Sequence, residues 1–148
     1  MTLFPKQDDP LKPLFINMGS STVQEIENGK KIMRSFIEIV DVLNKNGITL
    51  VAGTDMGFPG YSVFRELELF VACGLSPIEA IQSAAIIPAK VMGLANSLGS
   101  IEVGKQADLI LVDGDPLENM RNLRNVHTVI KAGKMYNPAA LHKMAGFN

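Results

Sequence analysis

The stretch GITLVAGTDMG, residues 47–57, decides how the fold of this chain is interpreted. The apolar and β-branched run Ile48–Ala52 is typical of a short strand that is buried on both faces. It ends in Gly53-Thr54-Asp55, and a carboxylate at the end of a buried strand is costly unless something uses it. In parallel α/β folds the C-terminal ends of the strands form the active face, so Asp55 is a candidate catalytic or metal-binding residue. The competing interpretation is a cap or turn residue.

Helical patterns lie on both sides of this run. The lead-in 1–19 is predicted to be irregular, and Thr22-Val23-Gln24-Glu25 has the form of a capping box. Downstream, Ser62 can cap a second helix, and Ser76-Pro77-Ile78-Glu79 is a strong start signal for a third. One apolar face of the first helix is expected to carry Ile32, Phe36, Ile39, Val40 and Leu43 at helical spacing. The order helix–strand–helix predicts a parallel α/β layer.

The pattern changes after Leu94, where a glycine-rich stretch leads into short strands. Strands are predicted at Ala107–Val112 and Val126–Ala132, with a turn at Ala132-Gly133 before Lys134-Met135-Tyr136. We therefore divide the chain into residues 1–95 and residues 96–148.

Composition excludes several classes of protein. The 148 residues are 47% apolar and 20% charged with a net charge of −1, so no basic field favours nucleic acid. No apolar run reaches the roughly 18 residues of a membrane span. Cys73 is the single cysteine, which fits a reducing, cytoplasmic compartment and a packed thiol. The N-terminus has neither a signal-peptide nor a transit-peptide pattern.

A metal site is the natural use for Asp55, but the ligand count is too small. A catalytic zinc site usually needs three protein ligands and an open position. The two histidines, His127 and His142, lie far along the chain and form no HxH or HExxH spacing. We interpret His127 as an outward residue on a strand and His142 as a solvated tail residue.

Gly99–Gln106 matches the front of a phosphate-binding loop and must be weighed. The position that should be Ser or Thr is Gln106, and the loop leads into a strand where a helix is required. A turn before the strand at Ala107 is the better interpretation.

Short motifs recur along the chain from Gly53 to Lys134. They are Gly53-Thr54-Asp55, Arg65-Glu66-Leu67, Cys73-Gly74-Leu75-Ser76-Pro77, Pro88-Ala89, Met92-Gly93-Leu94, Gly99-Ser100-Ile101, Gly104-Lys105, Ala107-Asp108-Leu109, Gly114-Asp115-Pro116-Leu117 and Gly133-Lys134. Together they resemble the metal-dependent amidohydrolase superfamily, and most of all its imidazolonepropionase-like and prolidase-like branch. The resemblance covers roughly residues 47–136.

The resemblance implies an α/β fold that is the C-terminal part of a (β/α)8 barrel plus part of an accessory β-sandwich. Residues 1–95 would supply helix 7, strand 8 and the following helices of the barrel, and residues 96–148 the C-terminal strands of the sandwich. Ile48–Ala52 then corresponds to the eighth strand. Asp55 corresponds to the aspartate that touches the metal and the nucleophilic water, and takes and returns a proton.

The resemblance also implies hydrolysis of a C–N bond in a small-molecule amide, a cyclic amide or a dipeptide, with a divalent metal, expected to be zinc. The family's histidine ligands have no counterpart here, so we expect a C-terminal segment of such an enzyme. The isolated chain is expected to hold no metal and to be inactive. One departure is Ser83-Ala84-Ala85, where the family often has Ala-Ala-Thr.

An alternative of a different class stays open: a non-catalytic protein that keeps this fold segment for association. The predicted strand and the apolar helix faces would lack their barrel neighbours. Exposed strand edges and apolar faces tend to find another chain, so we expect a homo-oligomer or poor solubility.

Overall fold

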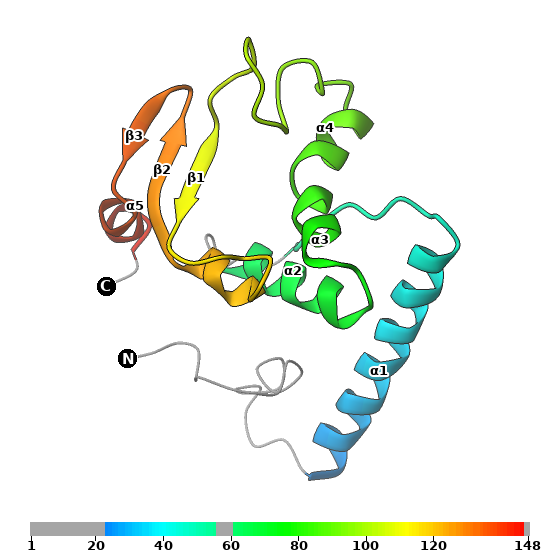
Figure 1. Ribbon diagram of the computed structural model, residues 1–148. Helices are drawn as coiled ribbons and strands as arrows, with labels where there is room; N and C mark the ends of the chain where they lie inside the picture. Colours follow the sequence, from blue (N-terminus) through cyan, green and yellow to red (C-terminus); the bar gives the residue numbers. More distant parts are fainter. Residues whose placement is uncertain (1–22, 56–60, 147–148) are drawn as a thin grey trace.

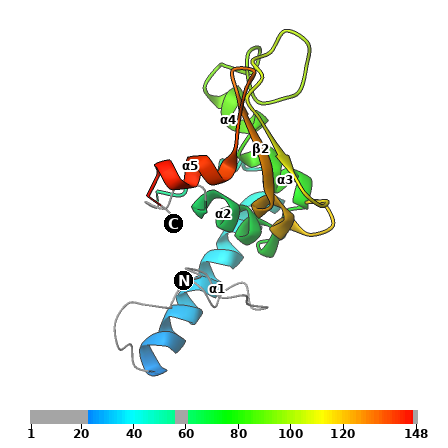
Figure 2. The ribbon, with the colours of Figure 1, turned by 90° about the vertical axis from the view of Figure 1, so that its left-hand side faces the viewer.

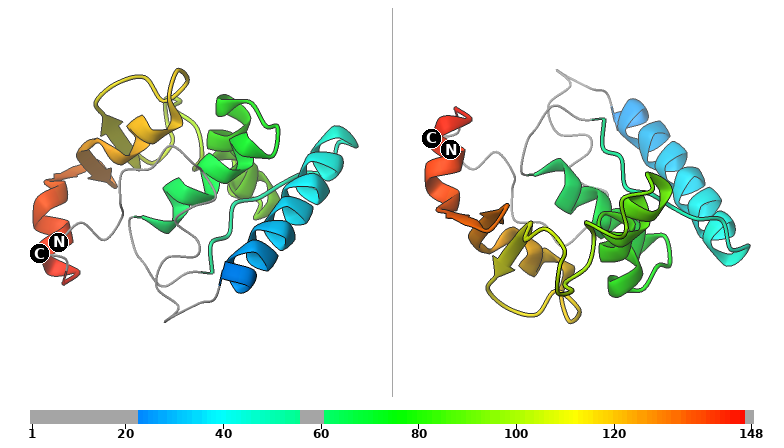
Figure 3. Two further views of the ribbon diagram at one scale, coloured as in Figure 1. Left: turned by 90° about the horizontal axis from the view of Figure 1, so that it is seen from below. Right: turned by 90° about the horizontal axis from the view of Figure 1, so that it is seen from above.

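The computed structural model describes residues 23–55 and 61–146. The predicted lead-in and Thr22 lie outside the described residues. The elements are α1 (Val23–Lys45), α2 (Ser62–Ala72), α3 (Pro77–Ser83), α4 (Ile86–Val91), β1 (Leu109–Val112), the 3-10 helix η2 (Met120–Arg124), β2 (Val126–Lys131), β3 (Lys134–Tyr136) and α5 (Pro138–Met144). Helices α2 to α4 lie between α1 on one side and the strands with α5 on the other (Figure 1), and the views in Figure 3 show the same order.

The strands form an antiparallel sheet in the order β1-β2-β3, which confirms the strands predicted in the second half of the chain. The turn between β2 and β3 contains Ala132 and Gly133, with φ angles of 49° and 77°. Asp108, just before β1, closes this turn: its carboxylate accepts from the Ala132 N–H at 2.7 Å and from Lys131 Nζ. The predicted turn position is therefore correct.

Helix α3 begins as the sequence predicts. The Ser76 hydroxyl accepts from the Glu79 N–H, and the Glu79 carboxylate accepts from the Ser76 N–H at 2.8 Å, so the capping box is complete. The Ser76 hydroxyl, which also donates to Glu79 Oε2 at 2.6 Å, and after it the Ser76 N–H lower the pKa of Glu79. Ser62 is not the cap of α2, because Tyr61 occupies that position and Ser62 is the first helical residue.

The hydrophobic core lies where α2, α3 and η2 meet. Its buried members are Leu67, Ala80, Met120 and Leu123. Nearby, the Glu68 carboxylate on α2 accepts from Arg124 Nε at 2.7 Å and from Arg65 Nη1 at 3.0 Å. These contacts tie the two predicted segments of the chain together, and the boundary near residue 95 stays a prediction.

The apolar face predicted for α1 is largely exposed in the structure. Ile32 and Phe36 are each 58% exposed and Ile39 is 54% exposed. The periodicity is real, but burial requires a partner surface, and within residues 23–55 and 61–146 only limited packing against α2 is available.

The run Ile48–Ala52 does not form a strand and is not buried on both faces, since Ile48 is 53% and Val51 40% exposed, which corrects both predictions made from its pattern. In the described part of the chain it belongs to no sheet. The Ala52 N–H donates to the Ser83 carbonyl at 2.9 Å, and the Ile48 N–H to the Leu43 carbonyl at 3.0 Å. A strand exists only as a member of a hydrogen-bonded ladder, and an apolar sequence cannot supply the neighbouring strand.

The chain's last described element is α5, which the sequence analysis did not predict. Asn137 caps it through hydrogen bonds to the Ala139 and Ala140 N–H groups. Figure 2 shows α5 beside β2 and near α2. None of the described helices combines the length and apolar character that a bilayer-crossing helix needs.

Candidate active-site segment

Asp55 follows the run Ile48–Ala52 after Gly53 and Thr54, and it is exposed. Its φ angle is 43°, in the left-handed region that non-glycine residues seldom adopt and that Asp tolerates better than most. Within the described residues, its carboxylate makes no hydrogen bond or ion pair. Such an exposed, unpaired carboxylate on a strained backbone is free to act on a group from outside the described chain.

The two residues before Asp55 are held by one face of α2. The Gly53 N–H donates to Glu66 Oε1 at 2.8 Å, and the Ser62 hydroxyl donates to Thr54 Oγ1 at 3.4 Å. Ser62 and Glu66 are four residues apart, so they lie one above the other on the same side of the helix. Successive residues of the candidate segment are therefore tied to successive turns of α2.

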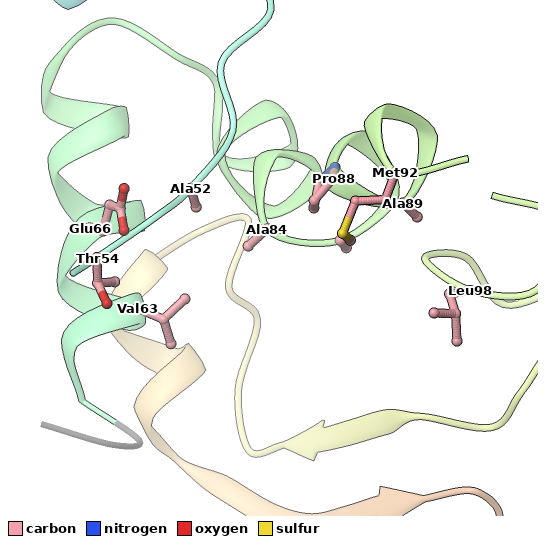
Figure 4. Close-up of a pocket in the computed structure, with 10 residues that line it drawn as sticks. Ala52, Thr54, Val63, Glu66, Ala84, Pro88, Ala89, Met92 and Leu98 are labelled. Carbon is pink, nitrogen blue, oxygen red and sulfur yellow. The ribbon is translucent and has the colours of Figure 1, made fainter. Parts of the chain in front are cut away.

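A cavity of about 450 Å³ opens beside this segment. Figure 4 shows the Glu66 side chain near Ala52 and Thr54 on one side, with Ala84, Pro88 and Met92 across the opening. Most lining residues are apolar, and Asp55 is not one of them. The cavity can accept an apolar group, with the Glu66 carboxylate as its acidic feature.

Glu66 Oε2 is buried and has no hydrogen-bond partner in the described residues. Arg65 Nε and Nη2 on the same helix are likewise buried and unpaired. Native proteins rarely leave buried polar atoms unpaired. The unpaired Glu66 oxygen therefore lies on a side chain that also contacts the candidate segment.

The described residues do not assemble a metal site. No group of three or more His, Cys, Asp or Glu side chains in residues 23–55 and 61–146 could hold a metal ion. His127 is exposed on β2, as predicted, with Nδ1 3.7 Å from an Asp113 oxygen. His142 was predicted to be solvated, and this was wrong: it lies half-buried on α5 with its ring 5.6 Å from the Tyr61 ring. Neither histidine joins Asp55 in a metal-binding group.

The glycine-rich loop before β1 is a turn, as predicted. Lys105 Nζ donates to the Ser100 hydroxyl at 2.5 Å and to Glu102 Oε1 at 2.9 Å. The Ser100 hydroxyl donates in turn to Glu102 Oε1 at 2.6 Å, and this hydroxyl, followed by the Lys105 ammonium, lowers the pKa of Glu102. Cys73 is a packed thiol, as predicted, and burial raises its pKa.

The sequence analysis missed Ser62 and Glu66 as partners of the candidate segment. Their spacing of four residues on the helix after Gly53-Thr54-Asp55 is a signal that the sequence contains. The spacing alone does not show which face of that helix contacts the segment. The three-dimensional structure is needed to identify that face.

Comparisons with known proteins agree on one family. The sequence model described as the amidohydrolase family matches residues 15–136. An imidazolonepropionase of Shewanella frigidimarina is 40% identical over 79 residues, covering 50% of this chain and 19% of that protein. An ochratoxinase of Aspergillus niger is 35% identical over 97 residues, covering 62% of this chain and 20% of that protein.

A solved structure gives the same answer. The crystal structure of a Xaa-Pro dipeptidase with bound methionine superposes with a TM-score of 0.64 at 35% identity, covering 77% of this chain and 27% of that one. The chain thus spans between about a fifth and about a quarter of the length of these relatives. Its mixture of helices and strands has the α/β fold of these proteins. The chain belongs to the amidohydrolase family, in its imidazolonepropionase-like and prolidase-like branch.

Proposed function

We propose that this chain supplies the eighth-strand aspartate and the C-terminal segment of a metal-dependent amidohydrolase. The reaction is hydrolysis of a C–N bond in a small-molecule amide, a cyclic amide or a dipeptide. Asp55 accepts a proton from the attacking water and returns it to the leaving nitrogen. The observation that carries the proposal is the exposed, unpaired Asp55 at the end of a segment anchored to α2.

The relatives support the bond type. Imidazolonepropionase, ochratoxinase and Xaa-Pro dipeptidase are the names of proteins that this chain resembles over its matched residues. A positioned acid–base group typically contributes about 10²- to 10⁴-fold in rate, which is the size of effect assigned to Asp55.

The family is generally metal-dependent, and the described residues do not fit a metal by themselves. One carboxylate is present where a catalytic zinc site usually has three protein ligands. Any divalent ion, expected to be zinc, therefore needs ligands from outside the described residues. Calorimetric titration of the isolated chain with zinc is expected to show no stoichiometric site. A site that vanishes in Asp55→Ala would contradict this.

A chimeric enzyme tests the proposed function. Residues 47–136 replace the matching segment of the Shewanella imidazolonepropionase, and hydrolysis of that enzyme's own substrate is measured. We expect measurable turnover, because this chain and that enzyme are 40% identical over 79 residues. The same enzyme without the segment is the negative control. A chimera that folds, by circular dichroism and sedimentation, but shows no turnover would overturn the proposal.

A second candidate function is association without catalysis. It is favoured by the apolar side chains of α1, several of which are more than half exposed in the described structure. Contiguous exposed apolar surface usually marks a site of protein interaction. A homo-oligomer formed through α1 is the specific form of this proposal.

A further inference from the structure

Glu66 lines the cavity and contacts the candidate segment. Its Oε1 atom accepts from the Gly53 N–H at 2.8 Å, while Oε2 is buried and unpaired in the described residues. A buried acceptor without a partner lowers stability. Packing alone therefore gives no reason for a carboxylate at this position.

The geometry of α2 gives such a reason. Glu66 and Ser62 share one helix face, and each bonds the residue of the segment that lies opposite it, Gly53 and Thr54. Asp55 comes next, in a left-handed conformation that a backbone seldom adopts without support. The direction of the Asp55 side chain therefore depends on the positions in which Gly53 and Thr54 are held.

We propose that Glu66 is the positioning residue for Asp55. Through the Gly53 N–H it fixes the backbone that carries the Asp55 carboxylate, and in this role it does not touch the reacting atoms. This inference rests on the proposed function, because the position of Asp55 matters to catalysis only if Asp55 transfers the proton. The hydrogen bond itself can be tested without any activity.

Nuclear magnetic resonance on the 148-residue chain provides the test. Two readouts are used: the hydrogen-exchange rate of the Gly53 amide and the backbone chemical shifts of Asp55. In Glu66→Ala we expect Gly53 to exchange at least about tenfold faster and the Asp55 shifts to move, because the amide loses its acceptor.

Two further substitutions separate the effect of the length of the Glu66 side chain from the effect of its charge. Glu66→Gln keeps an oxygen where Oε1 lies, so Gly53 exchange is expected to stay within about threefold of the parent. Glu66→Asp keeps the charge but is one methylene shorter, which takes the oxygen beyond hydrogen-bond distance. It should therefore resemble Glu66→Ala. If Glu66→Ala does not fold, the comparison of Gln with Asp decides the question.

Glu68→Gln is the matched control on the same helix. It weakens the ion pairs with Arg65 and Arg124 and lowers global stability without touching Gly53. After correction for thermal stability, Gly53 exchange and the Asp55 shifts should be unchanged.

Three results would overturn the proposal: unchanged Gly53 and Asp55 signals in Glu66→Ala, equal changes in Glu68→Gln, or parent-like behaviour of Glu66→Asp. Failure of the proposed function is distinguishable, because it would show as full turnover in a chimera that carries Asp55→Asn. That result would leave the effect of Glu66 on the Gly53 amide standing.

Discussion

At the scale of the residue, the backbone of Asp55 is as informative as its carboxylate. A φ angle of 43° costs an ordinary L-residue roughly 1–2 kcal/mol and costs glycine almost nothing. We therefore expect Asp55→Gly to be more stable than Asp55→Ala by about 1 kcal/mol, measured by chemical denaturation.

Asp113 is the control for this comparison. It is exposed like Asp55 and follows a β-strand, and its φ angle is not positive. At this position Asp113→Gly should be less stable than Asp113→Ala, because glycine loses more conformational freedom on folding. If Asp55→Ala is as stable as Asp55→Gly or more stable, Asp55 does not hold the left-handed conformation in solution.

The same residues show which parts of the candidate site could be predicted from the sequence. Asp55 could be identified as a candidate because its motif is local and its neighbours are small. The contact between Gly53 and Glu66 could not, because it joins residues 13 positions apart through the orientation of a helix. His142 shows the same limit, since its place against Tyr61 depends on how α5 packs.

At the scale of the element, the turn between β2 and β3 depends on the carboxylate of Asp108. The Lys131 ammonium, followed by the Ala132 N–H and the Gln106 amide, lowers the pKa of Asp108 from 3.8 to about 2. A group with a depressed folded-state pKa contributes stability that is present above pH 3.8 and is lost as the pH falls towards 2. We expect Asp108→Asn to lose less stability than the parent between pH 4 and pH 2.

Denaturant unfolding at several pH values measures this slope. Lys131→Met supplies the control, because removing the largest cause of the shift should also flatten the slope. Equal slopes in the parent and in Asp108→Asn would show that the carboxylate does not hold the turn in solution.

Elements differed in how well they could be predicted. Local sequence signals determine helix α3 and the turn between β2 and β3. These signals are a capping box in α3 and residues suited to positive φ in the turn. The expected strand at Ile48–Ala52 carries only an apolar pattern, and its hydrogen-bond partners must come from another strand. Pattern alone therefore predicted neither its structure nor its exposure, since Ile48 is 53% and Val51 40% exposed.

At the scale of the whole molecule, α1 exposes a row of apolar side chains. Burial of apolar surface is worth about 25 cal/mol per Å², so covering this face favours association. We expect sedimentation velocity at micromolar concentration to show self-association of the parent chain. Phe36→Glu should weaken it, because a buried charge without a partner is costly.

Glu38→Gln is the control, since Glu38 is an exposed polar residue of the same helix. It should leave the association unchanged. A single compact species at monomer mass for the parent, with cooperative thermal unfolding, would contradict the role of α1 as an interface.

The central claim is that Asp55 carries the proton in C–N bond hydrolysis. The most direct measurement is kcat of the chimeric enzyme with Asp55 and with Asp55→Asn, a change that keeps the size and the tolerance of the left-handed conformation. Asp113→Asn in the same enzyme controls for the loss of one exposed carboxylate. The account predicts that kcat falls by about 10²- to 10⁴-fold in Asp55→Asn and stays within about threefold in Asp113→Asn. A kcat in Asp55→Asn that equals the value in Asp113→Asn would contradict it.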